Sequence, residues 1–374
     1  NFILLSCLFI FLTQANVKNM FKQDSHMSKS GSWFEGLNEE IPIDKFFVIG
    51  DFGYLKHPEG LENMTNIMNY LNAEKDHDLI ITGGDNFYPS GIESIDDLED
   101  VDEVMTYFDK KNIKDLQLYA TLGNNDCEVD YKNEILYQDF NDKWNMPNDY
   151  YEMKFPLKDN PEKFLVLLMC NSALLTCKSS FLEQENSLVV CEDMLVEVGE
   201  QRVLDHYSWL EERLEMYSNN EDIAWLGLVL HHPPVLEASL KQDLLPLLQK
   251  HKVDFSFVGH KHQFEYNNIG YEDGIRFPGQ NRGPILEDCD RKEILNNPNR
   301  NHTFEKGAKL HQFMIGASGK KLKDVCPYKD QDGDVYFQNV EQHGLLSVDV
   351  DSEHFTVKYY QEEGEPFYEV TITS

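Results

Sequence analysis

The stretch GDNFYPSG, at residues 84–91, closely follows the short apolar run at residues 79–82. A short run rich in β-branched residues and ended by glycine and aspartate is typical of a buried strand with polar side chains at its carboxyl end. Five further runs of this kind occur in the chain, at residues 46–49, 116–122, 164–169, 224–230 and 253–258. The sequence therefore predicts six buried strands.

Helical patterns at residues 61–73 and 203–216 place apolar side chains on one face and lie between these runs. Strands that alternate with helices predict α/β layering. Residues 270–308 contain Gly, Pro, Asn and Arg without an apolar period, which predicts a long surface insertion. Three further runs predict the closing strands of a sheet, at residues 344–350, 354–360 and 367–372.

Polar motifs follow five of the apolar runs. They are GDFG at residues 50–53, GDNFY at 84–88, GNND at 123–126, HHPP at 231–234 and GHKH at 259–262. Because the carboxyl ends of strands in an α/β sheet meet at one edge, we expect the five motifs to form one site. Together they offer carboxylate, phenolate, amide and imidazole groups, a mixture that suits two hard or borderline cations.

The combined motifs resemble those of the purple acid phosphatases, particularly their small tartrate-resistant animal form. The resemblance extends from about Lys45 to Ile372, and residues 84–91 and the segment KWNMP at 143–147 resemble that form between the ligand positions. It implies a metallophosphoesterase-type β-sandwich of two mixed sheets flanked by helices. We expect this domain to occupy residues 42–374.

The resemblance also implies seven metal ligands. An Fe(III) ion would take Asp51, Asp85, Tyr88 and His262, and a divalent Fe, Zn or Mn ion would share Asp85 and take Asn124, His231 and His260. Tyr88 is the most discriminating ligand, because phosphodiesterases with HHPP loops generally lack it and a phenolate favours ferric iron. The implied reaction is metal-assisted hydrolysis of phosphate monoesters.

The chain departs from the family pattern at two histidine positions. Asn125 stands where the third family motif has a histidine, and the loop after the fourth motif, at residues 235–239, leads into a predicted helix without a histidine. Asn125 can donate a hydrogen bond to phosphate but cannot deliver a proton, and the loss of a general acid costs roughly 10²–10⁴-fold in rate.

Asn125 and His232 are the candidate catalytic residues of this sequence. His57 and Lys261 are alternative proton donors. For His232, His57 and Lys261, a structural or solvated role is the simpler interpretation. We therefore expect weakened phosphatase activity around a complete set of metal ligands.

The charge balance and the amino-terminal residues bear on the compartment. The chain has 66 acidic and 33 basic side chains, a formal net charge of −33, which makes nucleic acid and anionic membranes poor partners. The apolar run at residues 2–12 predicts a signal peptide that ends at residue 15, before a flexible leader at 16–41. Because the first residue is Asn, we expect an initiator Met and a basic segment to precede it. We expect no membrane anchor, and a secreted or lysosome- or vacuole-like location.

An exported chain with an even number of cysteines favours disulfides. After removal of Cys7 with the signal peptide, six cysteines remain. We expect the pairs Cys177–Cys191 and Cys289–Cys326, which would close loops in polar stretches. Cys170 lies within an apolar run and is predicted to be a buried free thiol.

Two sequons, which begin at Asn63 and Asn301, would be glycosylation acceptors in an exported protein.

Three functions remain open at this level. The first is a binuclear metal-dependent hydrolase of phosphate monoesters, whose substrate is a phosphorylated small molecule or a phosphoprotein. The second is a catalytically impaired purple-acid-phosphatase fold that serves as a structural or anchoring secreted glycoprotein, as in the parasite glideosome anchor that resembles this family. The third is a phosphodiesterase or nucleotide hydrolase. Metal content, turnover and the comparison of monoesters with diesters distinguish them.

Overall fold

The computed structural model describes residues 41–374, except 178–188, 272–292, 296 and 326–333. All of these residues belong to one compact unit, which begins at Asn38. The predicted signal peptide and almost all of the predicted leader lie outside the described residues. Cys289, Cys326 and the side chain of Cys191 lie outside them as well.

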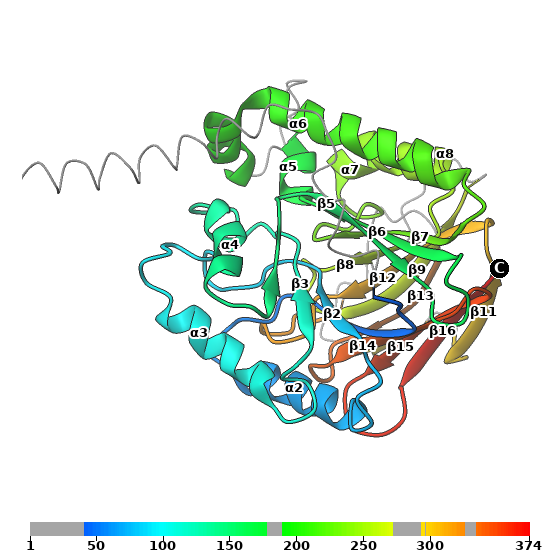
Figure 1. Cartoon of the computed structure of the whole chain (residues 1–374), viewed down its shortest axis with the longest axis horizontal. Helices are drawn as coiled ribbons and strands as arrows, with labels where there is room; N and C mark the ends of the chain where they lie inside the picture. Colours follow the sequence, from blue (N-terminus) through cyan, green and yellow to red (C-terminus); the bar gives the residue numbers. More distant parts are fainter. Residues whose placement is uncertain (1–40, 178–188, 272–292, 296, 326–333) are drawn as a thin grey trace, which may run out of the picture. The chain divides into compact units, whose positions relative to one another are not determined.

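The first sheet has eight strands in the order β11-β16-β15-β14-β1-β2-β3-β4 (Figure 1). β1 pairs in parallel with β2 and antiparallel with β14, so the sheet is mixed. Its strands are β1 (Lys45–Ile49), β2 (Leu79–Thr82), β3 (Gln117–Tyr119), β4 (Trp144–Asn145), β11 (Asn301–Glu305), β14 (Leu345–Val350), β15 (His354–Tyr360) and β16 (Tyr368–Thr373).

The second sheet also has eight strands, in the order β10-β13-β9-β12-β8-β7-β6-β5. β6, β7 and β8 are parallel neighbours, whereas β5 and β9 join their partners antiparallel. Its strands are β5 (Tyr151–Pro156), β6 (Phe164–Cys170), β7 (Ile223–Leu230), β8 (Phe255–Val258), β9 (Phe264–Gly270), β10 (Glu293–Leu295), β12 (Lys309–Ile315) and β13 (Asp334–Asn339).

Aromatic side chains fill the space between the two sheets. The rings of Phe255 on β8 and Phe355 on β15 stack with centroids 4.1 Å apart, and Phe46 on β1 meets Phe257 on β8 edge to face at 6.3 Å. All four side chains are fully buried. Their burial drives the sheets together, because each large aromatic ring removes an extensive apolar area from water.

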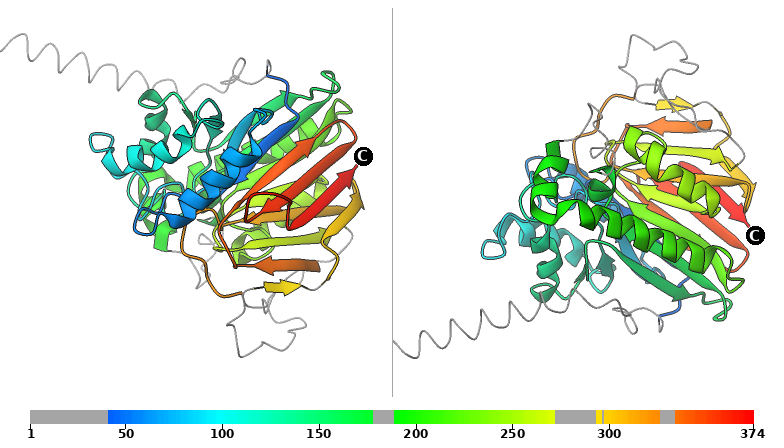
Figure 2. Two further views of the ribbon diagram at one scale, coloured as in Figure 1. Left: turned by 90° about the horizontal axis from the view of Figure 1, so that it is seen from below. Right: turned by 90° about the horizontal axis from the view of Figure 1, so that it is seen from above.

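Helices cover the outer faces of the sandwich (Figure 2). α2 (Glu59–Leu71) packs near β14 of the first sheet, with α3 (Glu99–Thr106) on the same side. The long α6 (Val189–Ser218) packs near β7 of the second sheet. The shorter helices are α4 (Lys132–Leu136), α5 (Ser172–Thr176), α7 (Ala238–Asp243) and α8 (Leu245–Lys250), and two 3-10 turns are η1 (Tyr107–Asp109) and η2 (Tyr137–Asp139). Two mixed sheets flanked by helices confirm the predicted fold class.

All six predicted buried strands and the three closing strands are present. The interpretation of residues 270–308 as an irregular surface insertion is wrong for two segments, because β10 pairs with β13 and β11 pairs with β16. In β11, exposed and half-buried residues alternate at the sheet edge, and this pattern has no apolar period that sequence analysis could detect. The helix predicted after residue 239 is two short helices, α7 and α8, with a proline at the start of α8.

The prediction of a buried free thiol at Cys170 is confirmed. Cys127 is a second buried cysteine with a free thiol. Cys177 is disulfide-bonded, and its partner is therefore neither of these two residues.

The two sequons differ in accessibility. The amide nitrogen of Asn63 donates to the carbonyl oxygen of His343 at 2.9 Å, and the Thr65 side chain is fully buried within α2. Asn301, at the start of β11, is exposed. Among the described residues, no helix combines the length and the apolar character that crossing a membrane requires.

Candidate metal centre

The five polar motifs meet at one edge of the sandwich, as predicted. Asp51 and Asp85 follow β1 and β2 of the first sheet, whereas His231 and His260 follow β7 and β8 of the second. Backbone hydrogen bonds join these loops, from the amide of Asp51 to the carbonyl of Gly84 at 3.0 Å and from Gly259 to His231 at 2.9 Å. The site is therefore built from both sheets.

Three of the site residues have backbones in the left-handed region. The φ angles are 56° at Asp51, 53° at Asp85 and 69° at His260. This conformation costs a non-glycine residue about 1–3 kcal/mol, and it is concentrated at functional sites whose surroundings maintain it. The strain turns these three side chains out of the strand direction and into the shared space between the loops.

Four of the predicted ligands form one cluster. The hydroxyl oxygen of Tyr88 lies 3.1 Å from Oδ1 of Asp51 and 2.9 Å from Oδ2 of Asp85. Nε2 of His262 lies 3.4 Å from Oδ1 of Asp51. Two donors bound to one ion at about 2.1 Å and at right angles lie about 3 Å apart. These separations therefore suit a single cation.

The remaining predicted ligands lie on the other side of Asp85. Nε2 of His231 is 3.4 Å from Oδ1 of Asp85, and Nδ1 of His260 is 3.0 Å from Oδ1 of Asn124. The rings of His231 and His260 meet edge to face with centroids 5.3 Å apart. Asp85 thus directs one carboxylate oxygen to each cluster, as a bridging ligand would.

The site fits a cation by two observations. Nε2 of His231 is buried and has no hydrogen-bond partner among the described residues, although an imidazole nitrogen in such a place ordinarily needs one. Asp51, Asp85 and His231 offer three ligand atoms that all lie within 4.8 Å of one another. A bound cation would provide a partner for Nε2 of His231 and would neutralise the carboxylates of Asp51 and Asp85.

The pKa shifts have the directions expected of a site that is built for positive charge. Burial raises the pKa of Asp51 to about 7, an effect that His231 opposes and Asp85 reinforces. Burial, with the nearby Asp51 and Asp85 carboxylates, raises the pKa of Tyr88 well above its ordinary value. A cation among these oxygens would reverse both shifts, because it favours the ionised carboxylate and phenolate.

Backbone carbonyls orient two of the imidazole rings. Nδ1 of His231 lies 2.9 Å from the carbonyl oxygen of Gly83, and Nδ1 of His262 lies 3.0 Å from that of Lys321. Each contact places a proton on Nδ1 and leaves the lone pair of Nε2 facing the carboxylates. Both rings are therefore held in the tautomer that can bind a metal.

The structure places Asn125 against Asp85. Its backbone N–H donates to Oδ1 of Asp85 at 2.9 Å, and its side-chain amide donates to Oδ2 of the same residue. Sequence analysis expected this amide to face a phosphate oxygen. The observed contacts instead make Asn125 a residue that orients the shared carboxylate.

The other three candidate proton donors differ in position. His232 is fully buried, with Nδ1 3.0 Å from the hydroxyl oxygen of Ser172, and burial lowers its pKa well below the ordinary value. His57 is exposed beside the ring of Tyr54. Lys261 forms an ion pair with Glu237 at 3.4 Å. The geometry gives His232 a structural place beside the centre rather than that of a proton donor.

Sequence analysis missed a buried polar network beneath Asp85. The side-chain amide of Asn86 donates to Glu134 at 2.9 Å and to Asp126 at 3.2 Å, and the backbone N–H of Gly123 donates to Asp126 at 2.7 Å. Burial raises the pKa of Asp126 to about 6. Asp126 belongs to a recognised motif, but no local signal connects it with Glu134.

Lys320 is the second residue that sequence analysis missed. Its ammonium nitrogen lies 3.8 Å from the centroid of the Tyr88 ring and 3.9 Å from that of Tyr54. The residue follows β12, whose carboxyl end carries none of the five motifs. Only the fold brings it to the site.

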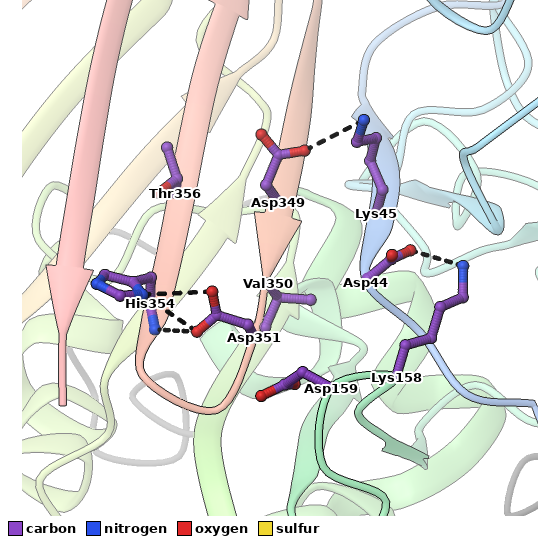
Figure 3. A pocket seen from close by; sticks show the side chains of 9 residues that line it. All are labelled: Asp44, Lys45, Lys158, Asp159, Asp349, Val350, Asp351, His354 and Thr356. Atoms are coloured by element: carbon purple, nitrogen blue, oxygen red, sulfur yellow. Dashed lines mark hydrogen bonds and ion pairs between the residues drawn. The ribbon is translucent and has the colours of Figure 1, made fainter. Parts of the chain in front are cut away.

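A pocket of about 300 Å³ lies at the opposite edge of the sandwich (Figure 3). It contains Lys45, at the start of β1, whereas the candidate centre follows the end of that strand. Its lysines are paired, Lys45 with Asp349 at 3.7 Å and Lys158 with Asp44 at 2.6 Å. Because both lysines are paired and the remaining carboxylates are exposed groups without a shared partner group, we assign no function to this pocket.

The chain is similar to known phosphoesterases and acid phosphatases. A family model described as calcineurin-like phosphoesterase matches residues 44–264. The tartrate-resistant acid phosphatase type 5 of Sus scrofa is 24% identical over 282 residues, which cover 71% of this chain and 77% of that protein. The enzyme of the same name from Homo sapiens is 23% identical over 249 residues, which cover 62% and 71%.

Two solved structures share the fold. GAP50, the anchor in the inner membrane complex of Plasmodium, has a TM-score of 0.61 at 16% identity and covers 88% of each chain. Purple acid phosphatase PPD1 from yellow lupin (Lupinus luteus) seeds has a TM-score of 0.57 at 13% identity, covering 90% of this chain and 55% of that one. Together with the sequence relatives, they confirm the resemblance to purple acid phosphatases.

Proposed function

Since this chain belongs to the calcineurin-like phosphoesterase family, we propose that it hydrolyses phosphate monoesters with two metal ions, as an acid phosphatase does. One observation carries the proposal. Seven donor side chains from five separate loops lie in two clusters that share Asp85.

We propose Fe(III) for the cluster of Asp51, Asp85, Tyr88 and His262, and a divalent Fe, Zn or Mn ion for Asp85, Asn124, His231 and His260. The phenolate of Tyr88 is the reason for iron in the first position. When bound, the metals supply Lewis acidity, which neutralises charge on a phosphate and makes water a better nucleophile.

The protein's own residues keep this centre in place. Asn125 and Tyr88 orient the carboxylate of Asp85, and backbone carbonyls orient the imidazoles of His231 and His262. No described side chain at the site is placed as an obvious proton donor for a leaving group. We therefore propose that the enzyme favours leaving groups that are weak bases, because these need little protonation in the transition state.

The wider setting follows the same proposal. The substrate is a phosphorylated small molecule or a phosphoprotein, and the protein is secreted or resides in a lysosome- or vacuole-like compartment. Exposed Asn301 is the better candidate for a glycan, because the side-chain amide of Asn63 already donates to the carbonyl oxygen of His343. The net charge of −33 makes nucleic acid a poor substrate.

Metal analysis with turnover tests the proposal. Protein produced with iron supplied should contain two metals per chain, absorb visible light through phenolate-to-iron charge transfer, and hydrolyse 4-nitrophenyl phosphate. Tyr88→Phe should abolish the absorption band with little loss of folding. The matched control is Tyr360→Phe, a buried tyrosine on β15, which should keep the band. A colourless, iron-free wild-type protein would contradict the assignment of iron.

The structural alternative rests on the Asn125 position. Its side chain contacts Asp85 and cannot deliver a proton, so a fold that keeps metals without turnover is the second candidate. Protein with both metals bound, an intact fold and no hydrolysis of any aryl phosphate would favour an anchoring or structural role. Faster hydrolysis of a diester than of the matching monoester would favour the phosphodiesterase alternative.

A further inference from the structure

The segment at residues 316–323 joins two parts of the candidate centre. It follows β12, and the backbone N–H of Lys320 donates to the carbonyl oxygen of Asp51 at 2.8 Å. The next residue, Lys321, accepts from the ring of His262 with its own carbonyl oxygen at 3.0 Å. Since both contacts use backbone atoms, the side chain of Lys320 is free to serve another purpose.

The ammonium group of Lys320 is held beside the site by aromatic rings. It lies 3.8 Å from the Tyr88 ring centroid and 3.9 Å from that of Tyr54, and the two rings meet edge to face at 5.9 Å. Cation–π contacts of this kind fix a lysine without neutralising it. The Tyr88 ring lies between this ammonium group and the carboxylates of Asp51 and Asp85, which both contact the Tyr88 hydroxyl. The charge of Lys320 interacts with the charges of these two carboxylates.

Two further lysines extend this positive charge. Lys56 and Lys323 are exposed, and both interact electrostatically with Lys320. Within the part of the chain that the structure describes, the ammonium groups of Lys56, Lys320 and Lys323 are in no recorded ion pair with a carboxylate. By contrast, Lys45 and Lys158 at the opposite edge are paired with aspartates (Figure 3).

Unpaired lysines beside one another are unexpected in a chain with twice as many acidic as basic side chains. Three like charges repel, and an acidic protein has ample carboxylates to neutralise them. Lys320 lies beside Tyr88 of the candidate centre, so its positive charge acts on an anion that is bound there. Lysine binds phosphate and carboxylate groups as a point charge.

We propose that Lys56, Lys320 and Lys323, which we call the lysine rim, select substrates whose leaving group carries a negative charge of its own. This inference rests on the proposed phosphatase function. The candidate metal centre would hold the phosphate that is transferred. The lysine rim, beside Tyr88, would bind the second anionic group. Electrostatic stabilisation of the leaving group would also matter more here, because Asn125 cannot protonate it.

The experiment compares three aryl phosphates that differ in charge opposite the phosphate: 4-carboxyphenyl, phenyl and 4-(trimethylammonio)phenyl phosphate. Lys320→Met should raise KM for the carboxylate substrate about tenfold or more, the usual loss of a hydrogen bond to a charged group. The cationic substrate should change less than about twofold. Lys320→Arg should keep the preference, because it keeps the charge.

The matched control is Lys250→Met, which removes the same charge from the exposed last residue of α8, before the start of β8, whereas the candidate centre follows the end of β8. It should leave all three KM values unchanged. An equal rise for all three substrates in Lys320→Met would overturn the inference, since it would indicate a general effect on the centre. Unchanged KM values would overturn it as well.

A binding measurement separates this inference from the proposed function. Calorimetry on the metal-loaded protein should show that pyrophosphate binds more tightly than inorganic phosphate, and that Lys320→Met removes this advantage. If no aryl phosphate is hydrolysed, the phosphatase proposal fails while the binding of the two anions still decides the role of the rim. If Lys320→Met loses metal, the double variant Lys56→Met/Lys323→Met, which alters exposed side chains only, gives the decisive comparison.

Discussion

At the scale of single residues, Asp85 is the side chain on which the candidate centre depends. Its Oδ1 accepts from the Asn125 backbone at 2.9 Å and lies 3.4 Å from His231, and its Oδ2 lies 2.9 Å from the Tyr88 hydroxyl. The residue is 1% exposed and has a left-handed backbone. These contacts offset the conformational cost and direct both carboxylate oxygens.

Asn125→His is the residue change that separates an enzyme from a scaffold. A histidine here could protonate a leaving group, so turnover of phenyl phosphate should rise about tenfold or more, against about twofold or less for 4-nitrophenyl phosphate. Steady-state kinetics on both substrates measures the effect. Metal content is measured in parallel, because Asn124 is the candidate ligand but Asn125 orients the carboxylate of Asp85.

The control for this change is Asn125→Ala, which removes the hydrogen bond to Asp85 without adding a proton donor. If Asn125 mainly orients Asp85, both variants will lose metal to a similar extent. Equal gains on the two substrates would point to better phosphate binding instead of proton transfer.

At the scale of elements, the loops after the strands approach one another so closely that several positions require glycine, Gly123 and Gly316 among them. A Cβ on Gly123, after β3, would lie 2.1 Å from Oδ1 of Asp85. A Cβ on Gly316, after β12, would lie 2.1 Å from the carbonyl oxygen of Lys261. The absence of a side chain at these positions lets the loops of both sheets reach the same small volume.

Gly123→Ala should therefore disturb the centre more than the fold. The added methyl group must displace Asp85, and an overpacking cost of about 1–3 kcal/mol corresponds to a roughly 5- to 160-fold loss of metal affinity. Metal retained against a competing chelator measures the loss. Gly83→Ala is the matched control, because its nearest contact, with the carbonyl oxygen of Ile49, is an ordinary 3.6 Å. Equal metal retention in the two variants would refute the argument.

At the scale of the whole molecule, the candidate centre joins the two sheets. Asp51, Asp85 and Asn124 follow strands of the first sheet, and His231 and His260 follow strands of the second. A metal bound there would link the sheets in addition to the aromatic core.

Removal of metal should accordingly lower the stability of both sheets together. A ligand present at 1,000 times its Kd stabilises the folded state by about 4 kcal/mol, so chelation should lower the free energy of unfolding by a similar amount. Hydrogen exchange should show that amides of β1 and β7 lose protection in parallel. Without chelator, the Asp85→Ala variant should already have a lower free energy of unfolding than the wild-type protein. Adding chelator should not lower it further. Loss of protection in one sheet alone would contradict a shared centre.

The sequence by itself determined the nine principal strands, the strand-end motifs and the donor types, because these depend on short runs of residues. Apolar periodicity and the polar residues that end it are local properties, as at residues 79–88. Only the tertiary structure decided how β9, β12 and β13 pair, that β10 and β11 lie in a presumed insertion, and that Asn125 contacts Asp85. It also decided that Lys320 enters the site. Strand pairing and side-chain placement depend on contacts between residues distant in the chain, about which local periodicity carries no information.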